Sequence, residues 1–274
     1  MMTVTHTHTS RLGAPVLTRQ LLDGWRGLLG WALGISAAIC AYLPLFPSLQ
    51  SPELRELVGS LPDSLVSTLG FDQITSGAGY TQATFFGLLG FVLATIAGTI
   101  WGAAAIAGAE ETGYLELTLA HAVGRRHYAL ASATALVVRM LGLGAITFAL
   151  ILSISGPAGL GLSASNILAA TLAWTGLTLM SGATALAVGA ASGRRSWAVG
   201  AGAGIAAAGY VLDAVGKSSD ELHAVGDLSP YRWAFGKQPL AEGFDWGGLG
   251  LLWGLVAALV GVTVWALARR DIQG

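Results

Sequence analysis

The chain has 274 residues, of which 54% are hydrophobic and only 11% are charged, and its formal net charge at pH 7 is −1. Soluble domains carry about 25% charged residues, so this composition excludes an ordinary soluble domain and indicates an integral membrane protein. The near-zero net charge excludes a general basic surface for nucleic acid. The single cysteine, Cys40, excludes an intrachain disulfide.

The first residues differ from the rest of the chain. Residues 1–15 are rich in threonine and histidine and predict a mobile polar tail. His6 and His8 are too few ligands for a closed metal site. In the next stretch, 16–26, apolar residues recur on one side and Trp25 is followed by Arg26, a pattern that favours an interfacial helix leading into the first span.

Six later stretches are long and apolar enough for membrane-spanning helices, which need about 20 such residues. They are 28–46, 84–108, 129–155, 165–191, 196–215 and 247–268. Only residues 192–195 separate the fourth and fifth spans, so these two should form a tight hairpin. The longer segments 47–81 and 216–246 fall on one side of the membrane. The fold class expected is therefore an all-α membrane protein, with residues 16–274 forming one six-span domain.

The distribution of cations predicts the orientation of these spans. Four cations lie near one predicted face: Arg55, Lys217, Arg232 and Lys237. Nine lie near the other: Arg11, Arg19, Arg26, Arg125, Arg126, Arg194, Arg195, Arg269 and Arg270. Basic residues concentrate on the cytoplasmic side of membrane proteins. This pattern places both termini and the loops after the second and fourth spans in the cytoplasm.

Several spans contain glycines four residues apart. The pairs are Gly30/Gly34, Gly98/Gly102, Gly200/Gly204 and Gly250/Gly254. Small residues at this spacing let helices approach closely in lipid. Each pair could pack inside the bundle or against a second subunit, and the sequence leaves both interpretations open.

A charged island separates the second and third spans. Between about 110 and 122, Leu115, Leu119 and Ala122 recur at helical spacing, while Glu111 and Glu116 lie off that stripe. This pattern predicts a short amphipathic helix at the membrane surface. A soluble partner could bind such a helix.

Motifs for catalysis are absent from the sequence. There is no HExxH motif and no Cys/His cluster with metal-ligand spacing. The run Gly216-Lys217-Ser218 fails as a Walker A motif because Val211 stands where a glycine is required. Ser181 is a conceivable nucleophile, but no span supplies a histidine as its base. We therefore predict no catalytic, cofactor-binding or metal-binding residue on this chain.

Two charged groups in the spans have more than one interpretation. Arg139 lies about 20 Å along the third helix, at about 1.5 Å per residue. It could extend toward the interface, line a translocation path or pair with another helix. Asp213, near the end of the fifth span, is expected to be a solvated carboxylate rather than a substrate contact. Most of the nine tryptophans lie near span ends and are expected to anchor the protein at the membrane interface.

The chain resembles the permease subunits of type-2 ABC transporters, most of which are exporters. The resemblance covers nearly the whole sequence: Trp25-Arg26 before the first span, the Leu-Phe-Pro-Ser-Leu exit at 45–49, and the charged island. The island is the most specific part, with an acidic pair, a glycine and Leu-Glu-Leu in Glu110-Glu111-Thr112-Gly113-Tyr114-Leu115-Glu116-Leu117, followed by the basic turn Gly124-Arg125-Arg126. Ala122 and Gly124 depart from the family pattern, which has a proline and a serine there.

This resemblance implies a division of labour between chains. Two permease units, either two copies or two homologous chains, would form the pathway in a bacterial cytoplasmic membrane. A pair of separate ATP-binding subunits, carrying ATP and Mg²⁺, would dock on the coupling helices. The residues implied for coupling are Glu110, Glu111, Gly113, Leu115, Glu116, Leu117, Arg125 and Arg126. The oily pathway favours a lipophilic drug, antibiotic or lipid as substrate. The alternatives are a non-transporting membrane scaffold and an intramembrane enzyme.

Overall fold

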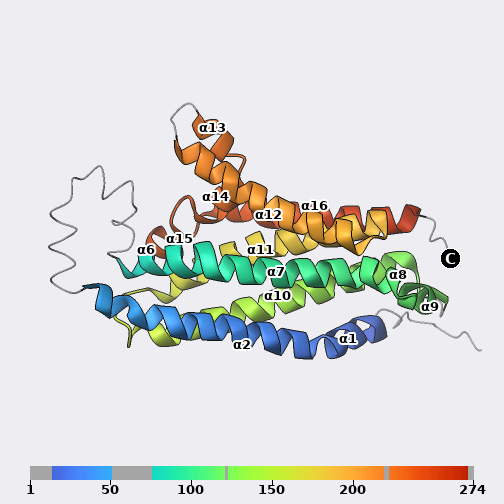
Figure 1. Cartoon of the computed structure of the whole chain (residues 1–274), viewed down its shortest axis with the longest axis horizontal. Coiled ribbons are helices and arrows are strands. Elements are labelled where there is room, and N and C mark those ends of the chain that lie inside the picture. Colours follow the sequence, from blue (N-terminus) through green and yellow to red (C-terminus); the bar gives the residue numbers. More distant parts are fainter. Residues whose placement is uncertain (1–13, 51–75, 121–122, 219–221, 271–274) are drawn as a thin grey trace, which may run out of the picture.

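A computed structural model describes residues 14–50, 76–120, 123–218 and 222–270 (Figure 1). The elements in these ranges are helical, and no strand occurs among them. Six helices are long and apolar enough to cross a membrane: Trp25–Ser48, Gly77–Glu111, Arg125–Ser155, Ala164–Ser192, Arg195–Ser218 and Trp246–Arg269. They overlap the six predicted spans, with ends that differ by a few residues, and confirm the all-helical class. The predicted tail, except residues 14 and 15, and most of the segment 47–81 lie outside the described residues.

The first half of the chain contains three of these spans. The first span contains α2 (Trp25–Tyr42) and most of the 3-10 segment η1 (Leu43–Gln50), and α1 (Ala14–Asp23) precedes it. The second contains α6 (Gly77–Thr81), η2 (Gln82–Leu89), α7 (Gly90–Ala103), η3 (Ala104–Gly108) and α8 (Ala109–Glu111). The short helix α9 (Tyr114–Ala120) lies between the second span and the third, which is α10 (Arg125–Ser155). The second span is continuous from α6 to α8, and it is π-helical in η2 and η3.

The second half begins with two long helices joined by a short turn, α11 (Ala164–Ser192) and α12 (Arg195–Ser218). Three short helices follow: α13 (His223–Gly226), α14 (Pro230–Phe235) and α15 (Pro239–Glu242). The last span is α16 (Trp246–Arg269). The first described residues of α1 and the last of α16 lie at the same end of the bundle, beside α8 and α9 (Figure 1).

The second span starts seven residues before its predicted first residue, at Gly77 rather than 84. Ser76 caps the helix, because its side-chain oxygen accepts a hydrogen bond from the Gly79 N–H at 3.0 Å. The Tyr80 hydroxyl then donates to the Tyr42 carbonyl at 2.7 Å, which ties this first turn to the end of the first span. A search for apolar runs passes over this turn, since its residues are small or polar.

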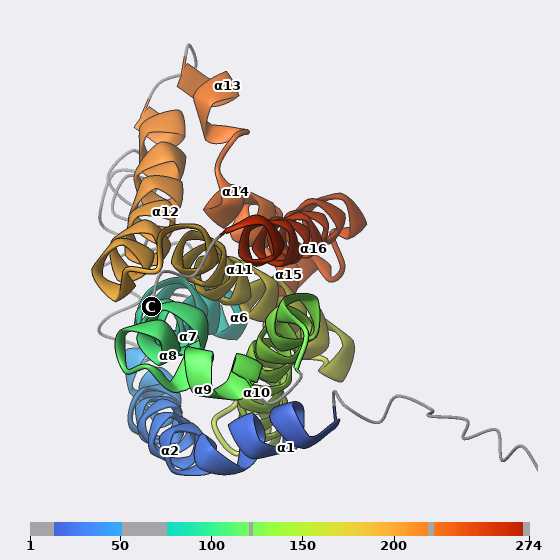
Figure 2. The same ribbon diagram turned by 90° about the vertical axis from the view of Figure 1, so that its right-hand side faces the viewer.

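Helix α11 forms the centre of the bundle. In the end-on view it lies among α7, α10, α12 and α16 (Figure 2). In its most apolar stretch, 83% of the residues are buried. Trp174 of α11 is fully buried, with its ring 6.1 Å from Phe85 and 6.2 Å from Phe86. The interface role expected for most tryptophans is therefore wrong for Trp174, which belongs to the core.

The glycine pairs separate into two groups. A Cβ atom built on Gly182 of α11 would lie 2.8 Å from the Gly98 carbonyl oxygen of α7, and one on Gly102 would collide with the Gly182 carbonyl. The Gly98/Gly102 pair therefore lets α7 and α11 touch along their backbones. The pairs at 30/34, 200/204 and 250/254 have no heavy atom within 4 Å of a built Cβ. These three pairs do not mediate helix packing within the described chain.

The predicted hairpin between the fourth and fifth spans is present. Helix α11 ends at Ser192, Gly193 adopts a φ of 67°, and α12 begins at Arg195. That left-handed conformation favours glycine. Helix α12 then packs through a row of small residues that includes Ala198, Gly202 and Ala206, while its far half diverges from the bundle toward α13 (Figure 1).

Candidate coupling surface and polar sites

The charged island folds into two short helices, α8 and α9, joined by a turn at the end of the second span. Helix α8 ends at Glu111, and the Thr112 hydroxyl donates to the Gly108 carbonyl at 3.0 Å. Gly113 adopts a φ of 71°, and its N–H donates to the Glu110 carbonyl at 2.9 Å. A left-handed residue at this point is most easily a glycine, so Gly113 sets the angle at which α9 leaves the bundle.

Helix α9 is amphipathic in the predicted sense. Leu115 is completely buried, and Leu119 packs partly against the core. Glu116 and Leu117 lie on the exposed side, with Leu117 64% exposed. The predicted third apolar position, Ala122, lies outside the described residues. An apolar anchor with a charged and an apolar residue on the outer face is a geometry suited to binding a soluble partner.

Glu110 is partly buried and belongs to a polar cluster that joins four spans. Its carboxylate forms an ion pair with Arg270 at the end of the sixth span. Arg270 also donates to the Ala190 carbonyl in the last turn of α11 at 2.9 Å, where a cation meets the negative end of the helix. The Arg270 carbonyl accepts a hydrogen bond from Arg125 at 2.7 Å, which adds the start of α10. We call Glu110, Arg125 and Arg270 the clasp.

Glu111 is held by a different helix. Its carboxylate accepts a hydrogen bond from the backbone N–H of Arg195 at 2.8 Å, and Arg195 is the first residue of α12. The first N–H groups of a helix have no partner within the helix, and they attract negative charge. Glu111 therefore caps α12 from another span.

Apart from Gly113, which forms the turn before α9, the residues implied for coupling fall into two sets. Glu110, Glu111 and Arg125 have partners within the chain, and Leu115 is in the core. Glu116, Leu117 and Arg126 lie on the exposed surface. The internal role of Arg270 was not predicted. The Arg269-Arg270 pair could have drawn attention to it, but the sequence gives no indication of its partner Glu110, which lies 160 residues earlier.

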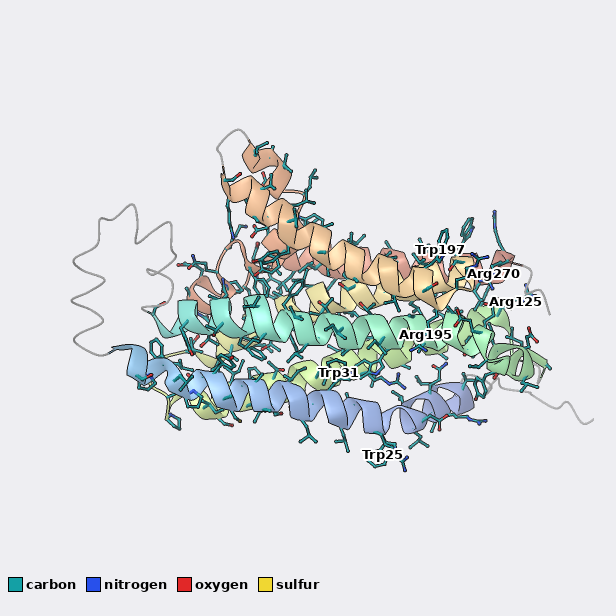
Figure 3. All side chains as sticks on the ribbon, viewed as in Figure 1. Trp25, Trp31, Arg125, Arg195, Trp197 and Arg270 are labelled. Atoms are coloured by element: carbon teal, nitrogen blue, oxygen red, sulfur yellow. The ribbon has the colours of Figure 1, made fainter. Side chains whose placement is uncertain are left out.

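Three exposed tryptophans lie toward this end of the bundle, and each has an arginine over its ring. The Arg26, Arg194 and Arg269 guanidinium carbons lie 5.7, 6.0 and 4.8 Å from the rings of Trp25, Trp197 and Trp265, respectively. Figure 3 shows Trp197 projecting from the surface near Arg270, and Trp25 projecting from the opposite edge of the bundle. This combination of indole rings and cations is typical of a membrane–water interface.

Arg139 lies under the α1–α2 elbow. Its guanidinium donates to the Gln20 carbonyl in the last turn of α1 and lies 5.7 Å from the Trp101 ring. A Cβ atom on Gly24 would overlap that guanidinium, so glycine at the elbow leaves the necessary space. A cavity of about 240 Å³ adjoins these residues. These contacts join α10 to α1 and α7, and the three interpretations of Arg139, including a role in a translocation path, stay predictions.

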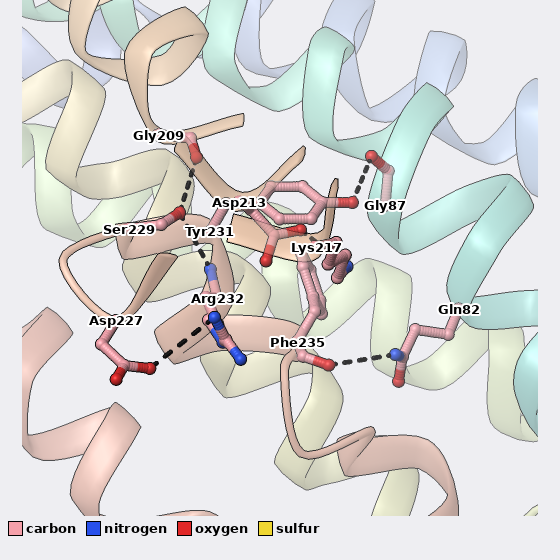
Figure 4. Close-up of polar contacts among 10 residues, drawn as sticks. All are labelled: Gln82, Gly87, Gly209, Asp213, Lys217, Asp227, Ser229, Tyr231, Arg232 and Phe235. Carbon is pink, nitrogen blue, oxygen red and sulfur yellow. Dashed lines mark hydrogen bonds and ion pairs between the residues drawn. The ribbon is translucent and has the colours of Figure 1, made fainter. Parts of the chain in front are cut away.

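A second polar cluster lies at the opposite end, where α14 returns to the bundle (Figure 4). The Ser229 hydroxyl donates to the Gly209 carbonyl at 2.6 Å, and the Tyr231 hydroxyl donates to the Gly87 carbonyl of η2 at 2.9 Å. A cavity of about 330 Å³ adjoins Tyr231, with Gln82 and Lys217 among its lining residues. These bonds connect α14 to both the second and the fifth spans.

Asp213 was expected to be a solvated carboxylate, and the structure shows instead that it is buried. It is only 4% exposed and pairs with Lys217 at 2.7 Å. The two residues are one helical turn apart, and the lysine extends its ammonium group to the buried acid. Burial, and then the neighbouring Tyr210 and Asp213, raise the pKa of Tyr231, so this phenol stays protonated and keeps its bond to Gly87.

Within the described residues, no three His, Cys, Asp or Glu side chains gather into a metal site. No protein-family model matches the chain, and no curated protein is significantly similar to it in sequence. The structure therefore supports one coarse assignment: the chain is a helical bundle with six helices able to cross a membrane.

Proposed function

We propose that this chain is the membrane-spanning permease subunit of an ATP-driven exporter of the type-2 ABC class. In this proposal it forms half of the translocation pathway in a bacterial cytoplasmic membrane. A second permease completes the pathway, and two separate subunits bind and hydrolyse ATP. Its cargo is a lipophilic compound, since few charges face the interior of the bundle.

The observation that carries the proposal is the way in which α9 is attached. The helix follows the second span directly and anchors Leu115 in the core, while Glu116 and Leu117 face outward. Beside it the clasp joins the second, third, fourth and sixth spans. A force applied to α9 would therefore reach several spans together, as rigid-body coupling requires.

Two further features support the proposal. The arginines predicted to be cytoplasmic include Arg125, Arg195 and Arg270, which lie near α9 (Figure 3). The glycine pairs on α2, α12 and α16 have open space around them, and open small-residue surfaces can accept another helix. Such surfaces suit a second permease unit.

The test is ATP hydrolysis by the chain reconstituted in liposomes with a candidate ATP-binding subunit. We expect Glu116→Ala/Leu117→Ala to insert normally and to weaken ATPase binding about ten- to a hundredfold, because a charge-assisted contact contributes about 1.5 to 3 kcal/mol. The matched control is Leu228→Ala/Glu242→Ala, which removes an exposed leucine and an exposed glutamate at the other end.

The outcome also separates the proposal from its alternative. If the α9 variant binds and hydrolyses like the wild type, α9 is not a coupling element and the assignment loses its main support. A chain that neither binds an ATP-binding subunit nor changes its ATP hydrolysis would instead fit a non-transporting scaffold.

A further inference from the structure

The cavity beneath the α1–α2 elbow contains a cation whose charge is not balanced by an ion pair. Among the described residues, Arg139 forms hydrogen-bond and aromatic contacts but no salt bridge. Its Nε is buried and has no hydrogen-bond partner. Arg139 as a whole is partly buried, and a cation within a span is costly unless water or an anion balances it. The site is therefore electrostatically suited to a negatively charged ligand.

The other lining groups define the chemistry that fits. Trp101, Tyr114 and Tyr128 supply aromatic walls. Gln20 supplies a buried amide oxygen that has no hydrogen-bond partner, and this oxygen could accept a bond from a ligand hydroxyl. The lining also contains a carboxylate, Asp23, whose charge acts on Arg139. Its side chain is 71% exposed and pairs with Arg19 at 3.6 Å, so solvent screens much of that charge.

The depth of the cavity in the membrane indicates which kind of molecule could supply the anion. Trp25 follows the elbow directly, is 51% exposed and lies beneath Arg26. Leu22 of α1 is 64% exposed nearby. Indole rings and cations gather at the headgroup region of a bilayer, so the cavity opens where phospholipid phosphates lie.

We propose that this cavity binds the phosphate of an anionic phospholipid from the leaflet on the arginine-rich side. The free edge of the Arg139 guanidinium holds the phosphate, because a planar guanidinium matches phosphate oxygens well. Gln20 accepts a hydroxyl of the headgroup, and the aromatic walls contact the glycerol. The bound lipid fixes the elbow against α10 and need not be transported, so this site does not depend on the proposed function.

The test measures phosphatidylglycerol bound to the purified full-length chain by native mass spectrometry. We expect the wild type to retain lipid and Arg139→Gln to bind it at least about tenfold more weakly. The glutamine can still donate to the Gln20 carbonyl, which limits damage to the elbow. Arg194→Gln is the matched control, since it removes an arginine stacked on a tryptophan but not from the cavity, and it should bind lipid normally.

A second pair of variants tests the proposal independently, in case Arg139→Gln does not fold. Ala104 lines the cavity, so Ala104→Leu should occupy the space and reduce lipid binding while Arg139 stays in place. Ala120→Leu adds the same bulk at an exposed position outside the cavity and should change nothing.

Inorganic phosphate distinguishes the two sources of the same chemistry. A lipid site is supported if excess phosphate does not displace phosphatidylglycerol. A site for free phosphate is supported if inorganic phosphate displaces the lipid and itself requires Arg139. Wild-type lipid binding by folded Arg139→Gln, or by Ala104→Leu, would overturn the proposal.

Discussion

Among the charged residues implied for coupling, Glu110 lies inside the bundle and not on its outer face. Its side chain is 17% exposed, and that of its partner Arg270 is 21% exposed. Removing the carboxylate would leave Arg270 partly buried without its anion. A partner of a charged hydrogen bond contributes about 1.5 to 3 kcal/mol, and partial exposure to solvent moves the value toward the lower end.

We therefore expect Glu110→Ala to lower the free energy of unfolding by about 1 to 2 kcal/mol, measured by denaturant unfolding in detergent micelles. Glu116→Ala is the control, because Glu116 is an exposed glutamate of the same island, and it should leave stability nearly unchanged. Equal stability of the two variants would mean that the clasp does not hold the spans together.

Asp245 gives a prediction about pH. Burial by itself raises the pKa of its carboxyl group, but the hydrogen bond from Lys237, the N–H groups of Gly248 and Gly247 and the lysine charge outweigh it, so the net pKa is lowered. A carboxyl group with a lowered folded-state pKa stabilises the protein above its unfolded pKa of about 3.9. This stabilisation is lost as the pH falls through the folded pKa.

Thermal unfolding of wild type and Asp245→Asn should therefore differ at neutral pH and converge as the pH falls below about 3.9 and through the lowered folded-state pKa. The asparagine retains the shape of the α16 cap but has no charge for Lys237. A constant difference in melting temperature across that range would show that the charge of Asp245 does not contribute.

The sequence pattern predicted the charged island, but it did not predict that the Glu110 and Glu111 side chains contact residues of other spans. Glu111 accepts a hydrogen bond from Arg195, which lies 84 residues later in the chain. Glu110 pairs with Arg270, which lies 160 residues later. Such contacts depend on where other spans end, which a local pattern does not encode. Leu115 and Leu119 were placed correctly because helical periodicity is local.

At the scale of elements, α7 and α11 depend on direct backbone contact. Gly102→Ala would place a methyl group against the Gly182 carbonyl, and a backbone group cannot move aside as a long side chain can. Overpacking of this kind costs about 1 to 3 kcal/mol. We expect Gly102→Ala to lower the unfolding temperature of the detergent-solubilised chain.

Gly204→Ala is the matched control for that prediction. It lies within α12, and a Cβ there meets no heavy atom within 4 Å. Replacing a helix glycine by alanine where space exists generally stabilises a protein, so this variant should be equal to or more stable than the wild type. A drop in stability for Gly204→Ala but not for Gly102→Ala would contradict the described packing.

The comparison of these glycines also shows the limit of sequence patterns. All four pairs have the same spacing, yet among the described helices only Gly98/Gly102 packs against a neighbour. Spacing identifies a surface that permits close approach, whereas the partner is fixed by the arrangement of all spans. The spans themselves were predictable, because hydropathy and length act within one segment.

For the whole molecule, the central α11 and the clasp make one end of the bundle a single mechanical unit. Helices from the second, third, fourth and sixth spans meet through Glu110, Arg125 and Arg270. The opposite end is connected differently, through Tyr231 and Ser229 of α14 (Figure 4). The proposed ATP-driven motion enters at the first end.

Photocrosslinking tests this claim most directly. A photoreactive phenylalanine analogue at Leu117, on the outer face of α9, is compared with the same group at Leu228, which is 69% exposed at the other end. In membranes that contain the candidate ATP-binding subunit, the account predicts a crosslinked product from position 117 and none from position 228. A crosslink from 228 alone, or from neither position in a complex that still assembles, would contradict it.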